Sequence, residues 1–125
     1  MSADLIASTG AVFSECGAYR YALWRYFVAE PTNLVAFIGL NPSTADERLN
    51  DPTIRRCIRF ARDWGHDGLV MLNLFALRAA DPRVMKAHLS PTGPDNDAAL
   101  MKWSAKCSRI VAAWGAHGSH LCRGD

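Results

Sequence analysis

Apolar residues are concentrated in three short continuous runs, residues 34–40, 68–77 and 109–115. Runs of this length that are rich in branched and aromatic side chains are typical of strands buried on both faces of a parallel sheet. Between the first two runs, apolar residues recur at helical spacing from Ile54 to Trp64. The pattern therefore predicts three parallel strands, the first two joined by a crossover helix.

The segment before the first run alternates between two faces, as an extended hairpin does. Residues 15–18 supply a turn, and the following strand divides into two sets of side chains: Tyr19, Tyr21, Leu23 and Arg25 on one face, and Arg20, Ala22, Trp24 and Tyr26 on the other. This alternation favours an N-terminal β-hairpin over residues 12–29 rather than a helix. Residues 1–11 show no clear period, so we interpret them as a lead-in.

Capping and turn residues indicate where the helices begin and end. Asp51 is expected to cap the crossover helix, with Pro52 at its first position and Gly65 after its end. A second helix is predicted from residue 94 to about residue 107, packed through Ala98, Met101 and Ala105. The proline-containing segment 78–94 is expected to be irregular, with one helical turn at residues 84–86.

These elements predict an α/β fold and one domain over residues 1–125. Its α/β core spans residues 34–115, and residues 116–125 form a small polar tail. The composition is that of a soluble globular protein, because 50% of the residues are hydrophobic and 21% are charged. No apolar run approaches the roughly 20 residues that span a bilayer, and the N-terminus lacks a signal-peptide pattern, so we expect a cytoplasmic protein and no membrane partner.

The charged and sulfur-containing residues restrict the chemistry only weakly. The net charge of +2 neither requires nor excludes a polyanionic partner. The cysteines at positions 16, 57, 107 and 122 are scattered without metal-ligand spacing, so we expect reduced structural thiols, no metal site and no cofactor.

Polar groups follow or interrupt all three apolar runs. Asn41-Pro42-Ser43 follows the first run, Asn73 lies within the second, and residues 114–117 end the third with Trp, Gly, Ala and His. The carboxyl ends of parallel strands lie at one edge of a sheet, where ligands of α/β proteins bind. The alternative is structural: Asn41 can bond its own turn, Asn73 can tie two strands together, and Trp114 can belong to the core.

Further candidate residues lie on the connecting segments. Ser43 and Thr44 either contact a ligand or close a turn. Arg78 is either a phosphate ligand or a partner of Asp81 or Asp46. Asp46 and Asp51 flank the first loop, where they either orient a water or a cation or are merely solvated. Arg55, Arg56 and Arg59, with Arg62, share one face of the crossover helix. That face is either merely solvated or a strip that tracks a nucleic-acid backbone. His117 and His120 are weaker candidates in the tail.

Taken together, these motifs resemble a known family. Over residues 12–120 the chain is similar to the bacterial and phage family catalogued as domain of unknown function 1643 (DUF1643). The motifs that carry this resemblance are GLNPSTA (39–45), NDPTIRRC (50–57), NLFALR (73–78), GPDND (93–97) and WG (114–115). More distantly, the order of GLNPS, LxN and WG motifs resembles the uracil-DNA glycosylase superfamily.

The glycosylase resemblance implies a fold and a site. It implies a three-layer α/β/α arrangement around a short central parallel sheet, with a base-binding pocket at the strand ends. By motif position, Asn41 would hold the attacking water and Asn73 would read the polar edge of the base. An Asn amide offers both a donor and an acceptor, and Pro42 would stiffen the loop. Glycosylases grip an extruded base in such a pocket.

One family segment has no counterpart in this sequence. The glycosylases carry a further strand and an HPSP-like loop after the WG strand, and residues 116–125 do not match it. We therefore expect the last strand to be lacking, which argues against uracil excision as the glycosylases perform it. It also leaves a bare sheet edge, through which we expect a homodimer.

Two functional hypotheses follow from the sequence. The first is a nucleobase-, nucleotide- or DNA-binding pocket that hydrolyses an N-glycosidic bond, with Asn41 and Asp46 as catalytic residues. The second is a non-catalytic module that binds the same ligands. A flavodoxin-like phosphate binder is a weaker third hypothesis, since Gly39 stands alone rather than in a glycine-rich loop.

Overall fold

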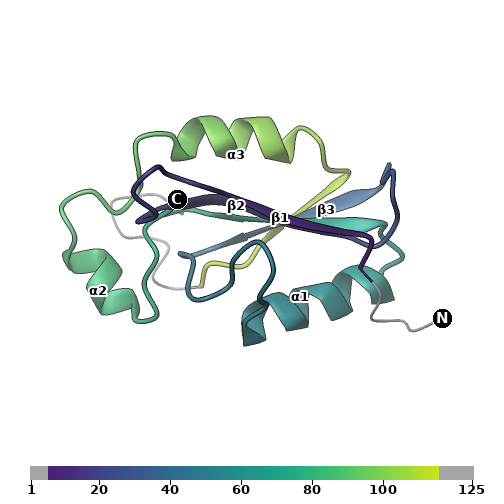
Figure 1. The fold of residues 1–125 in the computed structure, drawn as a ribbon, viewed down its shortest axis with the longest axis horizontal. Helices are drawn as coiled ribbons and strands as arrows, with labels where there is room; N and C mark the ends of the chain where they lie inside the picture. Colours follow the sequence, from purple (N-terminus) through teal and green to yellow (C-terminus); the bar gives the residue numbers. More distant parts are fainter. Residues whose placement is uncertain (1–5, 116–125) are drawn as a thin grey trace.

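The computed structural model describes residues 6–115, which form one five-stranded sheet and three helices (Figure 1). The strands are β1 (Ser8–Phe13), β2 (Arg20–Tyr26), β3 (Leu34–Gly39), β4 (Gly68–Asn73) and β5 (Arg109–Ala112). The helices are α1 (Pro52–Asp63), α2 (Pro82–Ala87) and α3 (Asn96–Ser104). The fold class expected from the sequence, α/β, is confirmed.

The sheet is mixed, with the strand order β1-β2-β4-β3-β5. The three apolar runs form β3, β4 and β5, and β3 pairs in parallel with both of the others, as the sequence predicts. The expected short central parallel sheet consists of β4, β3 and β5, and it is extended beyond the expectation because β2 pairs with β4 in antiparallel orientation and brings the hairpin into the same sheet. Strand β2 can lie inside the sheet because it has apolar, fully buried side chains on both of its faces, Ala22 on one and Leu23 on the other.

The predicted hairpin is present, but it begins earlier than expected. Strand β1 starts at Ser8, inside the segment interpreted as a lead-in, and pairs with β2 as far as Tyr26. The local sequence of residues 8–11 has little apolar period, because the outer edge of the sheet leaves Ser8 and Thr9 exposed. Pairing with β2 holds Ser8 and Thr9, and the next residues are also held by burial, since Gly10 is buried and Ala11 packs against the core.

The ends of the helices follow the predicted caps. Asp51 accepts a hydrogen bond from the Ile54 amide at 2.9 Å, and Pro52 occupies the first turn of α1. Gly65, with φ of +80°, lies just beyond the end of α1. Helix α3 ends at Ser104, three residues earlier than predicted, and the expected turn at residues 84–86 is the six-residue helix α2.

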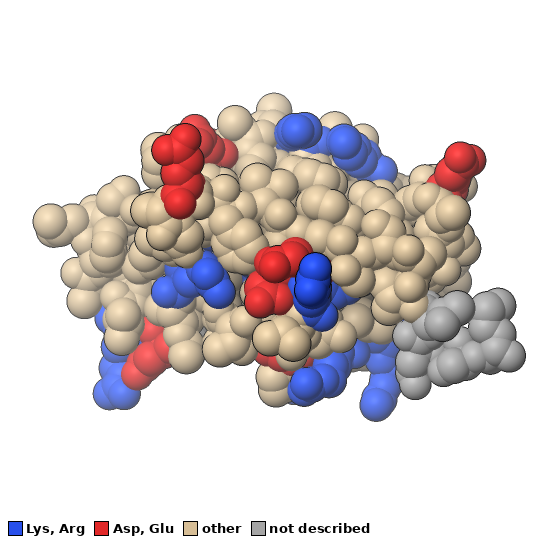
Figure 2. Space-filling model, in the orientation of Figure 1, with Lys and Arg blue, Asp and Glu red and all other residues tan. Residues whose placement is uncertain are grey.

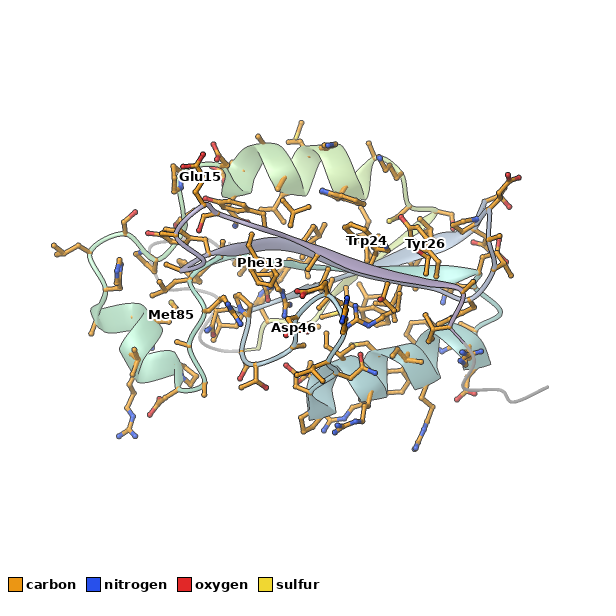
Figure 3. The ribbon with its side chains drawn as sticks, in the orientation of Figure 1. Phe13, Glu15, Trp24, Tyr26, Asp46 and Met85 are labelled. Atoms are coloured by element: carbon orange, nitrogen blue, oxygen red, sulfur yellow. The ribbon has the colours of Figure 1, made fainter. Side chains whose placement is uncertain are left out.

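Helices α1 and α3 cover opposite faces of the sheet (Figure 1). On one face Ile54, Cys57 and Ala61 of α1 pack against apolar residues of β2, β3 and β4. On the other face Trp103 of α3 packs against the same three strands. Its ring stacks on Trp24 with the centroids 5.3 Å apart, and Figure 3 shows Trp24 on the α3 side of β2. The core is thus divided into two halves by the sheet.

A β-bulge changes which face of β2 each side chain occupies. On β1 the neighbours Val12 and Phe13 pair with Ala22 and Arg20, so one extra residue of β2, Tyr21, lies between them. Tyr21 and Ala22 consequently both lie on the α3 side, and Arg20 lies on the α1 side with Leu23. The strict alternation expected from the sequence is therefore wrong between residues 19 and 22.

The connections of β3 and β4 leave the sheet in opposite directions. After β3 the chain reaches α1 on one face, whereas after β4 it passes through α2, beyond the end of the sheet, before it reaches α3 on the other face (Figure 1). Such a divergence between neighbouring parallel strands opens a crevice at their carboxyl ends, where α/β proteins bind ligands. Within residues 6–115, no helix is long and apolar enough to cross a membrane.

Candidate functional site

A cavity of about 210 Å³ lies at the carboxyl ends of β3 and β4. Its walls come from β2, from the ends of all three parallel strands, from the loop after β3 and from the first turn of α1. The polar side chains in these walls are Arg20, Asn41, Ser43, Asp51, Thr53 and Asn73. The sequence prediction of a site at this edge of the sheet is thus matched by a cavity that contains Asn41, Pro42, Ser43 and Asn73.

Asn73 is held at the cavity wall by its neighbours. It is the last residue of β4, is 3% exposed and lies directly opposite Gly39 of β3. A Cβ at position 39 would lie 3.0 Å from Asn73 Oδ1, so the glycine makes room for this amide. Asn96 of α3 donates from Nδ2 to the backbone oxygen of Asn73 at 2.9 Å and to that of Leu74 at 3.1 Å. Asn73 Nδ2 itself has no hydrogen-bond partner among residues 6–115.

Arg20 and Thr53 are polar cavity residues that the sequence did not indicate, and Arg20 is the buried one. The bulge in β2 turns its side chain to the α1 side, where it is 2% exposed. Nη1 donates to the Ala45 carbonyl at 3.1 Å, and Nε has no partner in the described part of the chain. Burial lowers the pKa of the guanidinium to about 10, against the opposing effect of the Asp51 charge, so Arg20 is cationic at neutral pH.

Asp51 is the acidic residue of the cavity wall, and its carboxylate also holds the local backbone. Oδ1 accepts from the Ile54 amide at 2.9 Å, and Oδ2 accepts from the Ala45 amide at 3.3 Å. Among residues 6–115 the one ion pair is Arg83 with Asp81, at 2.8 Å on the surface. Asp51 therefore influences Arg20 through space without a direct ion pair.

Asn41 fastens one loop to another. Its Nδ2 donates to the backbone oxygens of Pro42, Leu77 and Ala79, at 3.2, 3.3 and 2.8 Å. The amide nitrogen is thereby committed to the segments that follow β3 and β4. The structural role considered for Asn41, bonding its own turn, thus uses the amide nitrogen. Only the amide oxygen, Oδ1, is left to contact a ligand.

Four of the predicted catalytic and substrate-binding residues do not line the cavity. Asp46 accepts from the amides of Leu49 and Arg48 at 2.7 and 2.9 Å, and these bonds lower the pKa of its carboxyl group. Figure 3 shows Asp46 on the loop after β3. This Asx turn directs the Asp46 carboxylate to its own backbone rather than to the cavity. Thr44 is exposed on the same loop.

Arg78 and Trp114 also have structural surroundings. Arg78 donates from Nη1 to the Gly17 carbonyl at 3.2 Å, and its guanidinium lies 4.8 Å from the ring centre of Phe13. It thus steadies the turn between β1 and β2. Trp114 packs against a buried cluster of Leu74, Phe75 and Met85, as its core alternative predicts.

A second buried arginine, Arg25, fixes the 46–50 loop that leads to the cavity residue Asp51. Arg25 donates from Nη2 to the carbonyls of Asp46 and Leu49, at 2.7 and 3.1 Å, and from Nε to Asn50 Oδ1 at 2.9 Å. Its side chain is 1% exposed. Because three residues of the 46–50 loop bond one side chain, Arg25 determines the course of the loop that leads to Asp51.

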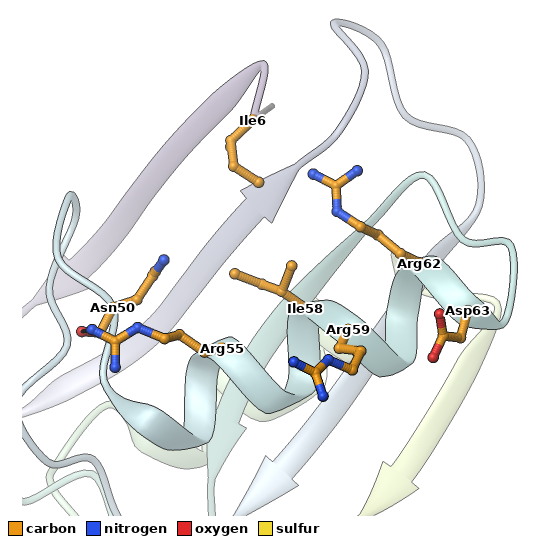
Figure 4. A pocket seen from close by; sticks show the side chains of 7 residues that line it. All are labelled: Ile6, Asn50, Arg55, Ile58, Arg59, Arg62 and Asp63. Carbon is orange, nitrogen blue, oxygen red and sulfur yellow. Dashed lines mark hydrogen bonds between the residues drawn. The ribbon is translucent and has the colours of Figure 1, made fainter. Parts of the chain in front are cut away.

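The predicted arginine strip lies outside this cavity, on α1. Arg55, Arg59 and Arg62 line a wide groove of about 550 Å³ between α1 and the start of β1, together with Ile6, Asn50, Ile58 and Asp63 (Figure 4). Arg56 lies on the adjoining surface with Arg55 and Arg59. Figure 2 shows Lys and Arg side chains along the lower edge of the molecule, where α1 lies. The structure therefore brings the three predicted backbone ligands together on one exposed surface.

The chain belongs to the family described as protein of unknown function (DUF1643), whose model matches residues 20–125. No significant match is found among curated proteins or among solved structures. The match begins at Arg20, so the buried arginine and both cavity asparagines lie within the family region. His117, His120 and the rest of segment 116–125 lie outside the described residues.

Proposed function

We propose that the cavity at the ends of β3 and β4 binds a nucleobase, carried by a nucleotide or by DNA. The observation that supports this most directly is a pair of buried donors without partners in residues 6–115, Asn73 Nδ2 and Arg20 Nε. A buried donor costs free energy unless a partner satisfies it, on the order of 1–3 kcal/mol. Carbonyl and ring-nitrogen acceptors on a base edge would satisfy both.

The size of the cavity supports a single ring as the bound group. A cavity of roughly 150 Å³ holds a benzene ring, and this one has about 210 Å³. Apolar atoms of Ile54 and Met71 line the same space, so a planar ring would contact apolar and polar walls together. The remainder of a nucleotide would extend out of the cavity.

The glycosylase-like, three-layer arrangement belongs to the same proposal. It is supported by helices on opposite faces of the sheet and by the position of the asparagines at the ends of β3 and β4. If the ligand is DNA, the exposed arginines of α1 are suited to contact its phosphates, since such contacts are electrostatic and independent of sequence.

Binding without cleavage is the function that the side chains favour. Asp46, the predicted catalytic carboxylate, bonds its own turn, and the donor of Asn41 is committed to backbone oxygens. Hydrolysis remains the second candidate, because Asp51 lines the cavity and Asn41 Oδ1 can orient a water. Water oxygen would then bond the anomeric carbon as the C–N bond breaks, and the water proton would pass through Asp51 to the departing base.

The experiment that tests the proposal is a combined binding and excision assay. Labelled single- and double-stranded DNAs would carry uracil, hypoxanthine, hydroxymethyluracil or normal bases. The variants are Asn73→Ala and, as a matched control at the opposite end of β3, Asn33→Ala. We expect base-dependent binding that Asn73→Ala abolishes and Asn33→Ala preserves, without abasic sites. Abasic sites that vanish in Asn73→Ala would establish hydrolysis instead, and equal binding by both variants would refute the site.

A further inference from the structure

The buried guanidinium of Arg20 makes no direct ion pair within residues 6–115, although the charge of Asp51 acts on it through space. Its side chain lines the cavity at 2% exposure, and its one hydrogen bond in that range joins Nη1 to a neutral carbonyl. Burying a charge is costly unless it is paired or well bonded. A ligand that brings electron-rich oxygens to Arg20 would therefore reduce the free-energy cost of burying this charge in the folded protein.

The second unsatisfied group of the cavity is also a donor. Asn73 offers Nδ2, and a Cβ built at Gly39 falls against its Oδ1, so the amide oxygen faces the neighbouring strand. Arg20 can only donate. The part of the wall made by these two side chains thus presents donors, and it matches ligand edges that present acceptors.

This donor set distinguishes between classes of base. At C4 of the pyrimidine ring and C6 of the purine ring, uracil, thymine, hypoxanthine and guanine carry a carbonyl oxygen, whereas cytosine and adenine carry an exocyclic amino group. An amino group would face donors and leave them unpaired, and buried unpaired groups discriminate strongly between analogues.

We propose that the cavity selects oxo-substituted bases, with Arg20 as the residue that recognises a carbonyl oxygen carrying partial negative charge. This inference rests on the proposed base-binding function and adds which class of base the cavity prefers. Arg20 acts by direct contact with the ring, and Asn73 supplies the second donor. No covalent step is involved.

The first test uses the unaltered chain. Isothermal titration at neutral pH would compare uracil, 5-fluorouracil and hypoxanthine with cytosine and adenine. We expect the oxo bases to bind at least about tenfold more tightly than the amino bases. The more acidic ring of 5-fluorouracil is expected to bind more tightly than uracil. Equal affinity for uracil and cytosine would overturn the inference, whereas the absence of binding by any base would overturn the proposed function itself.

The second test removes the charge. Arg20→Gln is expected to lose about tenfold or more in uracil affinity and the preference for 5-fluorouracil. The matched control is Arg78→Gln, which alters an exposed arginine outside the cavity and should leave both unchanged. An Arg20→Gln variant that folds and keeps the preference for oxo bases would contradict the role of Arg20.

A competition experiment on the unaltered chain covers the case in which Arg20→Gln does not fold. Inorganic phosphate and acetate would be added at concentrations that bracket the dissociation constant of uracil. We expect neither anion to displace uracil at a comparable concentration, because the site is shaped for a ring with acceptors. Displacement by phosphate at equal concentration would show a general oxyanion site and overturn the inference.

Discussion

The two buried arginines of β2 are satisfied to different degrees. Within residues 6–115 the Arg25 side chain has hydrogen bonds to Trp24, Asp46, Leu49 and Asn50, whereas the Arg20 side chain has one, to Ala45. Bonded in this way, Arg25 is a structural group that defines a loop. Arg20 lies on the same strand and the same face, yet it is left with donors for a ligand.

Removing Arg25 is expected to destabilise the protein. In Arg25→Met the guanidinium is lost, and the carbonyls of Asp46 and Leu49 lose their partner, so we expect the free energy of unfolding to fall by about 2–4 kcal/mol. Urea denaturation followed by fluorescence measures this change. Arg48→Met, an exposed residue of the same loop, is the control and should change the free energy by less than about 0.5 kcal/mol. Equal effects would contradict the structural role of Arg25.

Two cysteines are expected to differ in reactivity. Burial raises the pKa of Cys57 to about 11, whereas a hydrogen bond with Ser14 lowers the pKa of the exposed Cys16. Because the thiolate is the reactive form, iodoacetamide at pH 8 should modify Cys16 first, and peptide mass spectrometry would measure the order. In urea the difference should disappear. Faster modification of Cys57 in the folded protein would contradict its buried position on the sheet-facing side of α1.

The raised pKa of Cys57 makes the stability of the folded protein depend on pH. The folded-state pKa of Cys57 lies above the ordinary thiol value of 9.0. The unfolded chain therefore loses this proton first, and the stabilising contribution of Cys57 is full below about pH 9 and declines as the pH rises towards 11. Cys57→Ala should show a weaker decline over that range in urea denaturation, after its own loss of packing is subtracted. An identical decline in both proteins would contradict this assignment.

At the scale of elements, the strands and α1 could be predicted because their signals are local. The apolar runs of β3 and β4, and the Asp51 cap with Pro52, depend on neighbouring residues alone. The pairing of β2 with β4 could not be predicted in this way, since it joins segments that lie far apart in the chain. The bulge at Tyr21 was missed for a related reason, because it is defined by pairing with β1.

The candidate site was predictable to a similar extent. Asn41, Pro42, Ser43 and Asn73 reach the cavity because they follow directly from strand ends. Arg20 could not be found, since the bulge reverses the face on which alternation places it. Asp46 was assigned to the site because a carboxylate next to the GLNPSTA motif can orient a water or a cation. In the structure its carboxylate instead accepts hydrogen bonds from the amides of Arg48 and Leu49 in an Asx turn.

The exposed arginines of helix α1 are predicted to contact nucleic-acid phosphates. Arg56 and Arg59 are exposed, so replacing each by Gln should remove one phosphate contact and reduce the dependence of log K on log salt concentration by about 1 per residue. Fluorescence anisotropy with labelled duplex at several salt concentrations measures this slope. Arg83→Gln, whose guanidinium pairs with Asp81, is the control. A slope unchanged in Arg56→Gln/Arg59→Gln would refute the phosphate surface.

At the scale of the whole molecule, the sheet has one edge suited to association. Strand β5 ends the strand order, and among residues 6–115 its outer edge has no paired strand. Ile110 on this strand is 54% exposed. An unpaired edge with an exposed apolar residue is a template for pairing with another chain.

We therefore propose a homodimer formed through β5. Light scattering after size exclusion, at micromolar concentration, should give the mass of a dimer, and Ile110→Lys should convert it to a monomer. Val12→Lys places the same charge on β1, the opposite edge strand, and should leave the dimer intact. A monomeric mass for the unaltered chain would contradict the proposal.

The central claim is that a base enters the cavity between the ends of β3 and β4, and nuclear magnetic resonance of the amide groups tests it most directly. Uracil would be titrated into ¹⁵N-labelled protein with the side-chain amide of Asn73 assigned. The account predicts saturable shifts of the Asn73 side chain and of the Gly39 and Ser43 backbone amides, which surround the cavity. Shifts confined to α1, or no saturable shift at Asn73, would contradict it.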